Sequence, residues 1–369
     1  MARIEFRLFH DGQPATREQL DAVEEITVEQ RVDAAWECRA TYPVRVDAQG
    51  SWTGADEPWM QPFSRYRVEI RIAGGPWVAL IDGSIASRQS PRSPEPGRST
   101  LTLVVHDDSV LLNREQGAEP LEGTLTEVVE QLFEHEAIAS TDVEAPEEGG
   151  GDGSTPVTMR RGSPMQILRQ LARQADMHAY VLPGDSPGES VGCFKAFPTE
   201  PGDLPALYLL GPDRNLEDFT VSGDHAGPAR AHASGLSFAD KSIATAQTGQ
   251  SDLALLGDEP APAGTQEASV LAPPAYGGVT DPTTRATATS RRASRAIEAR
   301  GSLRTGVYTG VLRPYEAVEV GGVKDTDSGT YVIRQVTHTL TRSVYTQRFS
   351  LVRDAVSGGG GGGLPGGLF

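Results

Sequence analysis

Alternation of apolar and polar residues is the clearest pattern in this chain, and it is strongest between residues 301 and 353. Short alternating runs there are separated by glycine or by Asp-Ser-Gly, which predicts strands joined by tight turns. The apolar positions are Val318 and Val320, then Tyr331, Ile333 and Val336, and finally Tyr345, Phe349 and Leu351. The same pattern predicts a first β-rich barrel or sandwich domain before residue 113, with strands at 26–28, 36–40, 66–72, 77–83 and 100–108.

Two amphipathic helices are predicted between the two β-rich regions. The first follows a capping box formed by Thr124 and Glu127, and its apolar residues fall on one stripe. The second begins at Ser163, an N-cap residue followed by proline at the first helical position. It leads into a strand at 179–182, so residues 114–203 are predicted to form an α+β domain.

The remaining strands lie on either side of a long interruption. Residues 204–238 return to strand patterns, and with 301–355 they are predicted to form a second β-domain. Residues 239–281 are rich in Ala, Pro, Gly and Thr and lack an apolar period, which indicates an excursion or a linker. Residues 283–300 contain good helix formers and end before Gly301, a residue type that commonly terminates helices.

The predicted fold class is therefore mainly β with an α+β insertion that contains two helices. The predicted segments are a first β-domain at 1–113, the α+β domain at 114–203, the second β-domain at 204–238 and 301–355, an insertion at 239–300 that ends in a helix, and a flexible glycine-rich tail at 357–369.

Composition narrows the classes of function. The 369 residues carry a net charge of −17, which argues against nucleic-acid binding by phosphate neutralisation. No run of about 18 apolar residues and no charged-then-apolar leader is present, so we expect no membrane span, no signal peptide and folding in the cytoplasm. Two cysteines, Cys38 and Cys193, are too few for a disulfide framework or a four-thiolate zinc site, and buried free thiols are expected.

No catalytic constellation is visible in the sequence. It contains no HExxH, no Gly-x-Ser-x-Gly elbow and no P-loop. His106-Asp107-Asp108 is best interpreted as a strand end with solvated carboxylates rather than as a metal or base site. We therefore predict no catalytic residue, no metal site and no cofactor.

An arginine cluster between residues 285 and 304 is the best candidate for a functional patch. Arg291 and Arg295 lie four residues apart on the predicted helix, with Arg292 beside them. A solvated helix face that offsets acidic loops is the favoured interpretation. A dock for an acidic neighbouring subunit is the alternative.

Two apolar features are further candidates for contact surfaces. Aromatic residues are unusually dense at Trp52, Trp59 and Phe63, which suggests either core packing or an anchor between subunits. The glycine-rich tail is interpreted as a disordered end. Its tip, with Leu368 and Phe369, could instead dock into a partner.

The ordered set of strands resembles the phage late-control protein D family of tail baseplate hubs. A Leu-x-Pro turn at 312–314 enters the strand at Val318, a Ser-Gly-x-Tyr hairpin follows at 328–331, and a Val-x-His strand at 336–338 precedes the last strand. Earlier counterparts are Leu80-Ile81-Asp82-Gly83 and Val105-His106-Asp107-Asp108. The hub half of VgrG spike proteins of type VI secretion shares the same barrel. One departure is Tyr315, at a turn where relatives commonly carry glycine.

The resemblance implies a structural homotrimer rather than an enzyme. Each chain would supply two β-barrels similar to tube proteins, and the six barrels of a trimer would cap a hexameric inner tube. The opposite face would meet a trimeric spike, which must be a separate chain because nothing resembling a spike follows Arg353. Other baseplate subunits are expected neighbours, and a phage tail, a tailocin and another injection system all stay open as the particle. A tail-associated cell-wall hydrolase and a stand-alone ligand-binding β-barrel are the alternatives.

Overall fold

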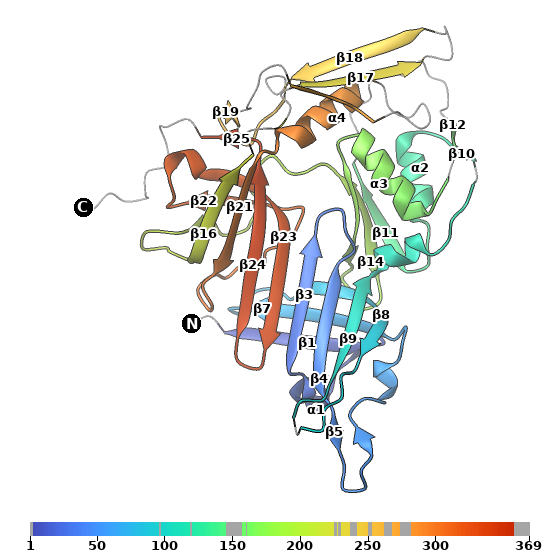
Figure 1. The fold of residues 1–369 in the computed structure, drawn as a ribbon, viewed down its shortest axis with the longest axis vertical. Coiled ribbons are helices and arrows are strands. Elements are labelled where there is room, and N and C mark those ends of the chain that lie inside the picture. Colours follow the sequence, from blue (N-terminus) through green and yellow to red (C-terminus); the bar gives the residue numbers. More distant parts are fainter. Residues whose placement is uncertain are drawn as a thin grey trace.

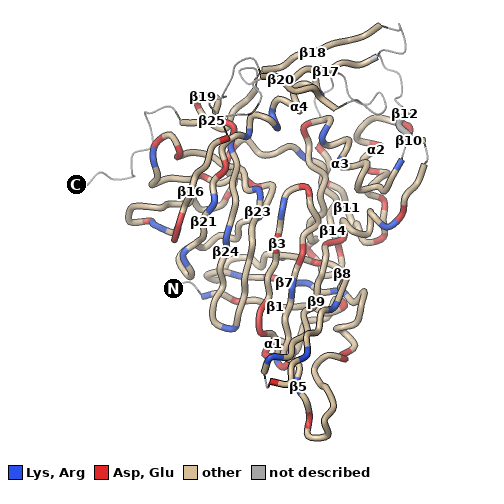
Figure 2. Tube along the Cα trace, viewed as in Figure 1, with Lys and Arg blue, Asp and Glu red and all other residues tan. Residues whose placement is uncertain are grey.

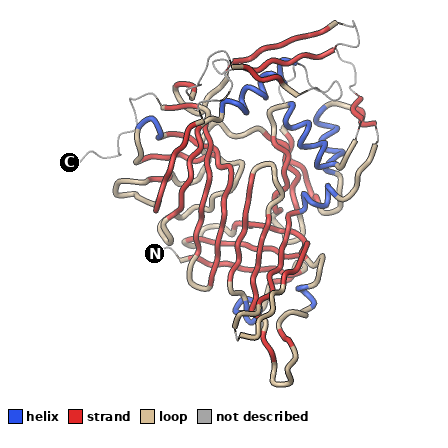
Figure 3. The backbone as a smooth tube through the Cα atoms, viewed as in Figure 1, coloured by secondary structure: helices blue, strands red, loops and turns tan. Residues whose placement is uncertain are grey.

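The computed structural model describes residues 3–95, 97–118, 120–144, 157–159, 161–224, 227, 230–236, 242–249, 253–261, 268–273 and 282–357. The chain is mainly β, with one large sheet, several small ones and a few short helices (Figures 1 and 3). This confirms the predicted mainly-β class with a helical insertion. The glycine-rich tip of the tail, with Leu368 and Phe369, lies outside the described residues.

The large sheet has 13 strands and two halves. The first half comprises β1 (Ile4–His10), β3 (Glu25–Arg31), β4 (Glu37–Pro43), β7 (Arg65–Ile72), β8 (Val78–Gln89) and β9 (Thr100–Asp107), with short β2 (Gln13–Pro14) at its edge. The second half comprises β15 (Leu207–Tyr208), β16 (Leu216–Gly223), β21 (Ile297–Leu303), β22 (Ala317–Gly321), β23 (Gly329–Thr341) and β24 (Tyr345–Arg353).

The two halves are joined edge to edge by β23 and β3. The antiparallel ladder runs from Gln335 opposite Arg31 to Thr341 opposite Glu25. The first residues of β23 pair instead with β22, so this long strand belongs to both halves. Each half has its own hydrophobic core, and Figure 1 shows β23 and β3 side by side.

A buried polar chain crosses this ladder. The Gln30 side chain donates to the Leu80 carbonyl at 2.7 Å, so its amide oxygen accepts from Nε2 of His338 at 3.1 Å. Nδ1 of His338 then accepts from the Tyr345 hydroxyl at 2.8 Å. Every polar atom of the neutral imidazole is thereby satisfied, and burial lowers the pKa of His338 to about 3.

Both predicted mid-chain helices are present with their capping boxes. These are α2 (Leu125–Phe133), capped by Thr124, and α3 (Pro164–Gln174), capped by Ser163. Their apolar stripes form a separate core with a three-stranded sheet of β11 (Ile138–Val143), β14 (Ser190–Lys195) and β13 (His178–Pro183). A shorter helix, α1 (Arg17–Ala22), lies between β2 and β3.

Two expectations for the region after residue 229 are wrong. The predicted helix at 283–300 stops early: α4 spans Pro282–Ser294, and β21 begins at Ile297. Buried Ile297, Ala299, Gly301 and Leu303 alternate along this strand, and β16 and β24 flank it. Gly301 lies inside this strand instead of ending a helix, and the position needs glycine because a Cβ there would lie 2.5 Å from the Asp218 carbonyl oxygen and 2.8 Å from Phe349.

The second correction concerns residues 230–236, which we expected in the second β-domain. They form β17 (Arg230–Leu236), which pairs with β18 (Ile243–Gly249) and β20 (Ser269–Leu271) in a small sheet against α4. Part of the predicted linker is therefore structured. The other small elements are β5 (Arg45–Val46), β6 (Trp52–Thr53), β10 (Pro120–Glu122), β12 (Val157–Met159), β19 (Glu259–Pro260), β25 (Ala355–Val356), η1 (Pro58–Met60), η2 (Asp108–Asn113) and η4 (Asp325–Asp327).

Replacing Gln30 with leucine should lower the free energy of unfolding by about 2–4 kcal/mol, because His338 Nε2 and the Leu80 carbonyl would both lose their buried partner. The measurement is urea denaturation. The control is Gln335→Leu on the same ladder. The Gln335 amide donates to Glu29 at an exposed position, so this substitution should lower the free energy of unfolding by less than about 1 kcal/mol. Equal losses in the two variants would contradict this role of the buried chain.

Acid should destabilise the fold through His338. An unfolded histidine, with a pKa of 6.5, binds a proton below that pH, whereas folded His338 stays neutral down to about pH 3. The unfolded state therefore gains the proton first, and at pH 5 this residue lowers the free energy of unfolding by about 2 kcal/mol relative to pH 8. Between pH 8 and pH 5, the free energy of unfolding of the His338→Gln variant should fall by about 2 kcal/mol less than that of the wild type. Urea titrations at the two pH values measure the difference. Parallel losses in wild type and variant would refute the assignment.

Candidate functional site

The helical domain meets both halves of the large sheet around Tyr315. This residue lies before β22 with a φ of 69°, in the left-handed region that favours glycine. Its ring stacks on Tyr180 of β13, with centroids 3.6 Å apart. Its hydroxyl accepts a hydrogen bond from the Asp33 backbone N–H, in the β3–β4 turn, at 2.8 Å. A tyrosine at this φ is less favourable than a glycine, but its contacts connect the helical domain to both halves of the large sheet.

His178 extends this junction. Its Nδ1 lies 3.0 Å from a carboxylate oxygen of Asp33, and its ring stacks on Phe197 with centroids 3.9 Å apart. Burial lowers the pKa of His178, and the bond to Asp33 opposes that shift. The guanidinium of Arg295 also lies over the Phe197 ring, 4.4 Å from its centroid. The junction is therefore a packed aromatic cluster with one paired carboxylate.

A buried ionic network forms a second tie between the first half of the sheet and the helical domain. The Arg65 guanidinium forms ion pairs with two buried carboxylates, those of Asp82 at 2.9 Å and Asp108 at 2.8 Å. Asp108 also accepts from the Ser190 hydroxyl at 2.8 Å, and Asp82 accepts from the Gly188 N–H at 2.8 Å. Asp82 of β8 and Asp108 of η2, just after β9, thus connect the first half of the sheet to β14 and to the loop before it.

Arg67 completes this network. It bonds Glu69 at 2.6 Å and Asp82 at 3.1 Å, and it donates to the backbone carbonyls of Gly184 and Ser186 at 2.8 and 3.2 Å. Arg67 itself is buried. A cation in this position holds the β13–β14 loop against the sheet because its donors are shared between carboxylates and backbone carbonyls.

The interpretation of His106-Asp107-Asp108 as a solvated strand end is wrong. Asp107 and Asp108 are both buried. Asp107 accepts from the backbone N–H groups of Trp36, at 2.6 Å, and Ser109, at 2.9 Å. Burial raises the pKa of Asp107 to about 6, and these hydrogen bonds limit the rise. The residues form a structural node at the end of β9.

The arginine cluster points into the molecule, which contradicts the expectation of a solvated helix face. Arg291 pairs with Asp176 at 2.7 Å, just after α3. Arg292 donates to carbonyl oxygens at the C-terminal end of α3, including Ala172 at 3.2 Å, and stabilises that end of the helix dipole. With Arg295 over Phe197, the cluster joins α4 to the helical domain. Figure 2 shows these positive charges where α4 approaches α3.

The three aromatic candidates have different environments. Trp59 stacks on buried His10 with centroids 4.0 Å apart and packs against the first core. Trp52, on β6, is 41% exposed, and Phe63 is 70% exposed with a φ of 71°. Core packing thus accounts for Trp59, whereas Trp52 and Phe63 remain available as anchors.

The described residues hold two free cysteines and no group of side chains suited to a metal ion. Both cysteines are free and buried, as expected, and burial raises the pKa of Cys193 to about 12. No cluster of three or more His, Cys, Asp or Glu side chains suited to a metal ion occurs among the described residues. In the same part of the chain, no helix has the length and apolar character to cross a membrane.

The fold defined by this sheet, its two cores and its helical domain is that of phage tail proteins, and it recurs in a type VI secretion component and in VgrG complexes. The 43 kDa tail protein of prophage MuSo2 from Shewanella oneidensis is 12% identical, with a TM-score of 0.63 over 95% of this chain and 98% of that one. A tail protein from Neisseria meningitidis MC58 is 13% identical, with a TM-score of 0.59 over 95% and 96%.

A third structure extends the likeness to secretion. The Escherichia coli c3393 protein, described as a type VI secretion component similar to T4 tail proteins, is 11% identical and matches 96% of this chain and 77% of its own, with a TM-score of 0.56. No family model and no curated protein matches the sequence. The likeness is therefore one of fold.

Replacing Asp82 with alanine should lower the free energy of unfolding by about 2–4 kcal/mol, because Arg65 and Arg67 would each lose a buried carboxylate and keep only Asp108 and Glu69, while the Gly188 N–H would lose its acceptor. Thermal and urea unfolding measure the loss. Asp56→Ala is the matched control, since the 87% exposed Asp56 side chain lies 3.9 Å from Arg88 and should contribute less than about 1 kcal/mol. Similar values for both variants would rule out a structural role for the network.

Proposed function

We propose that this chain is the baseplate hub of a contractile phage tail or a related injection system. The observation that carries the proposal is the match along almost the whole of both chains to the Shewanella tail protein, 95% of one and 98% of the other. That structure is described as a tail protein, and the sequence of this chain shows no catalytic motif. We therefore propose a structural role rather than an enzymatic one, assembled in the cytoplasm without a cofactor.

We further propose that the hub is a homotrimer that adapts a hexameric inner tube to a separate trimeric spike, among other baseplate subunits. The two halves of the sheet support this, since each is a set of mainly antiparallel strands with a core of its own. If each half acts as one tube-like barrel, three chains supply six copies, which match a hexamer, while the trimer keeps threefold symmetry for the spike.

The proposed domain boundaries follow the same division. The first barrel takes residues 1–113, the α+β domain takes 114–203, and the second barrel takes the strands of 204–238 and 301–355. Two adjustments come from the strands themselves: residues 297–300 join the second barrel through β21, and 230–236 leave it for the small sheet on α4.

Contacts between subunits are proposed for the exposed aromatic residues. Trp52 and Phe63 are large, rigid and 41% and 70% exposed, which are properties of interface anchors. The tail tip with Leu368 and Phe369 is proposed as a secondary contact. If deleting residues 357–369 leaves assembly unchanged, the tail has no such role.

The purified chain should sediment as a trimer, three times its 39.3 kDa, in analytical ultracentrifugation. The double variant Trp52→Ser, Phe63→Ser should shift it toward monomer by at least tenfold in the association constant, since two hot-spot aromatics are lost. Val344→Ser, at a 42% exposed apolar position, is the control and should leave the trimer intact. A stable monomer, or turnover of cell-wall material in a hydrolase assay, would overturn the hub proposal.

A further inference from the structure

A groove of about 440 Å³ lies between α3, α4 and the strand β20. Its lining combines an apolar wall with arginines, namely Val270, Leu271 and Pro273 with Arg173, Arg285 and Arg292. The described lining contains no carboxylate, although the chain as a whole carries a net charge of −17. Leu271, one of the lining residues, is 80% exposed.

Among the strands that the structure describes, β20 has no partner on the side that faces away from β17. Among the described strands it pairs only with β17, in parallel, and the Ala272 N–H donates to the His232 carbonyl at 2.7 Å. Backbone groups alternate in direction along a strand, so those of Leu271 are directed to the opposite side, away from β17. A segment laid along this edge could therefore bond the backbone of β20.

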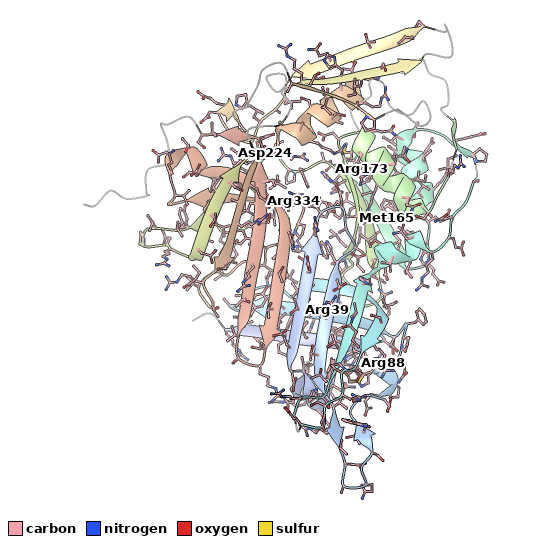
Figure 4. All side chains as sticks on the ribbon, viewed as in Figure 1. Arg39, Arg88, Met165, Arg173, Asp224 and Arg334 are labelled. Atoms are coloured by element: carbon pink, nitrogen blue, oxygen red, sulfur yellow. The ribbon has the colours of Figure 1, made fainter. Side chains whose placement is uncertain are left out.

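The positive charge beneath the edge is held in place. Arg292 is fixed by the carbonyl oxygens of Ala172 and Met177 at 3.2 and 3.4 Å. Those partners are neutral; the carboxylates of Asp176 and Asp33 act on Arg292 only through space, because they are bonded to Arg291 and His178. Arg173 lies at the end of α3 nearest α4, with an exposed side chain (Figure 4). An incoming carboxylate would meet the exposed guanidinium of Arg173, in the field of the fixed charges of Arg285 and Arg292 beneath it.

We propose that this groove binds an extended acidic segment of a partner protein, which adds to the edge of β20 as a further strand. Pairing with β20 requires that the side chains of the bound segment alternate between two kinds. Ala231 of β17 is buried and pairs with Val270, so this face of the sheet lies toward α4 and the arginines. Residues opposite Val270 are then acidic, and residues opposite exposed Leu271 are apolar. The surface is separate from the trimer contacts proposed above and does not depend on the hub function.

The test measures fluorescence anisotropy of the full chain with a labelled peptide, Glu-Val-Glu-Val-Glu-Val. Saturable binding is expected, weakened at least fivefold by Arg173→Gln or by Leu271→Ser. Binding should also weaken as salt is raised from 50 to 300 mM, because exposed charges are screened. Both variants change exposed side chains, and circular dichroism checks that each one folds.

Matched controls define the site. Arg17→Gln changes a 90% exposed arginine on α1, and Ile243→Ser changes a 74% exposed residue on the opposite edge strand of the same small sheet. Both should bind the peptide as wild type does, and the peptide Lys-Val-Lys-Val-Lys-Val should not bind. The proposal is overturned by absent binding, by equal binding of the basic peptide, or by controls that weaken binding as much as the test variants.

Discussion

The rest of the structure depends on the seam between β23 and β3. This ladder joins segments about 300 residues apart, and the hydrogen bond between His338 and Gln30 crosses 308 positions of sequence. Pairing two strands so far apart in sequence costs loop-closure entropy. The two apolar cores and the buried hydrogen bonds of Gln30, His338 and Tyr345 must offset this cost. Because the polar groups are satisfied only in this register, a slip of one residue would leave the imidazole unpaired in the core. The seam therefore fixes how the two halves lie.

The helical domain depends on that seam through three separate ties. Tyr315 and His178 connect it to both halves, Arg65 and Arg67 connect it to the first, and Arg291 connects it to α4, the helix that precedes β21 of the second. Buried ion pairs contribute little net stability when compared with apolar packing, because desolvation offsets their attraction. Their geometric demands are strict, however, so we interpret the network as a device that selects one arrangement of the domains. In the proposed hub, which would join a hexameric tube to a trimeric spike, such rigidity would keep the two symmetries in register.

Much of the fold could be predicted from sequence because the signals are local. Capping boxes at Thr124 and Ser163 define the helix starts, and alternation defines most strands. The end of α4 could not be predicted in this way, since residues 295–300 have good helix propensity, and only the pairing of β21 with β16 and β24 makes them extended. Tertiary context outweighed propensity at this boundary.

The buried charges of the candidate site were harder to predict for the same reason. Asp107, Asp108 and the arginines resemble solvated surface residues when each is considered alone. Their burial depends on partners distant in sequence, such as Asp82 and Ser190 for Arg65 and Asp108. One signal was available: the β7–β8 register places Arg67 opposite Asp82, so adjacent predicted strands carry opposite charges at facing positions. The resemblance to tail hubs, by contrast, came from the order of short motifs and agrees with the fold comparison.

The stoichiometry of the complex with the inner-tube protein tests the central proposal most directly. Native mass spectrometry of the chain mixed with its tube protein would give the ratio. Three copies of this chain bound to one hexameric ring are predicted, with each chain supplying two of six positions. A ratio of six to six, or the absence of any complex with the tube, would contradict the account.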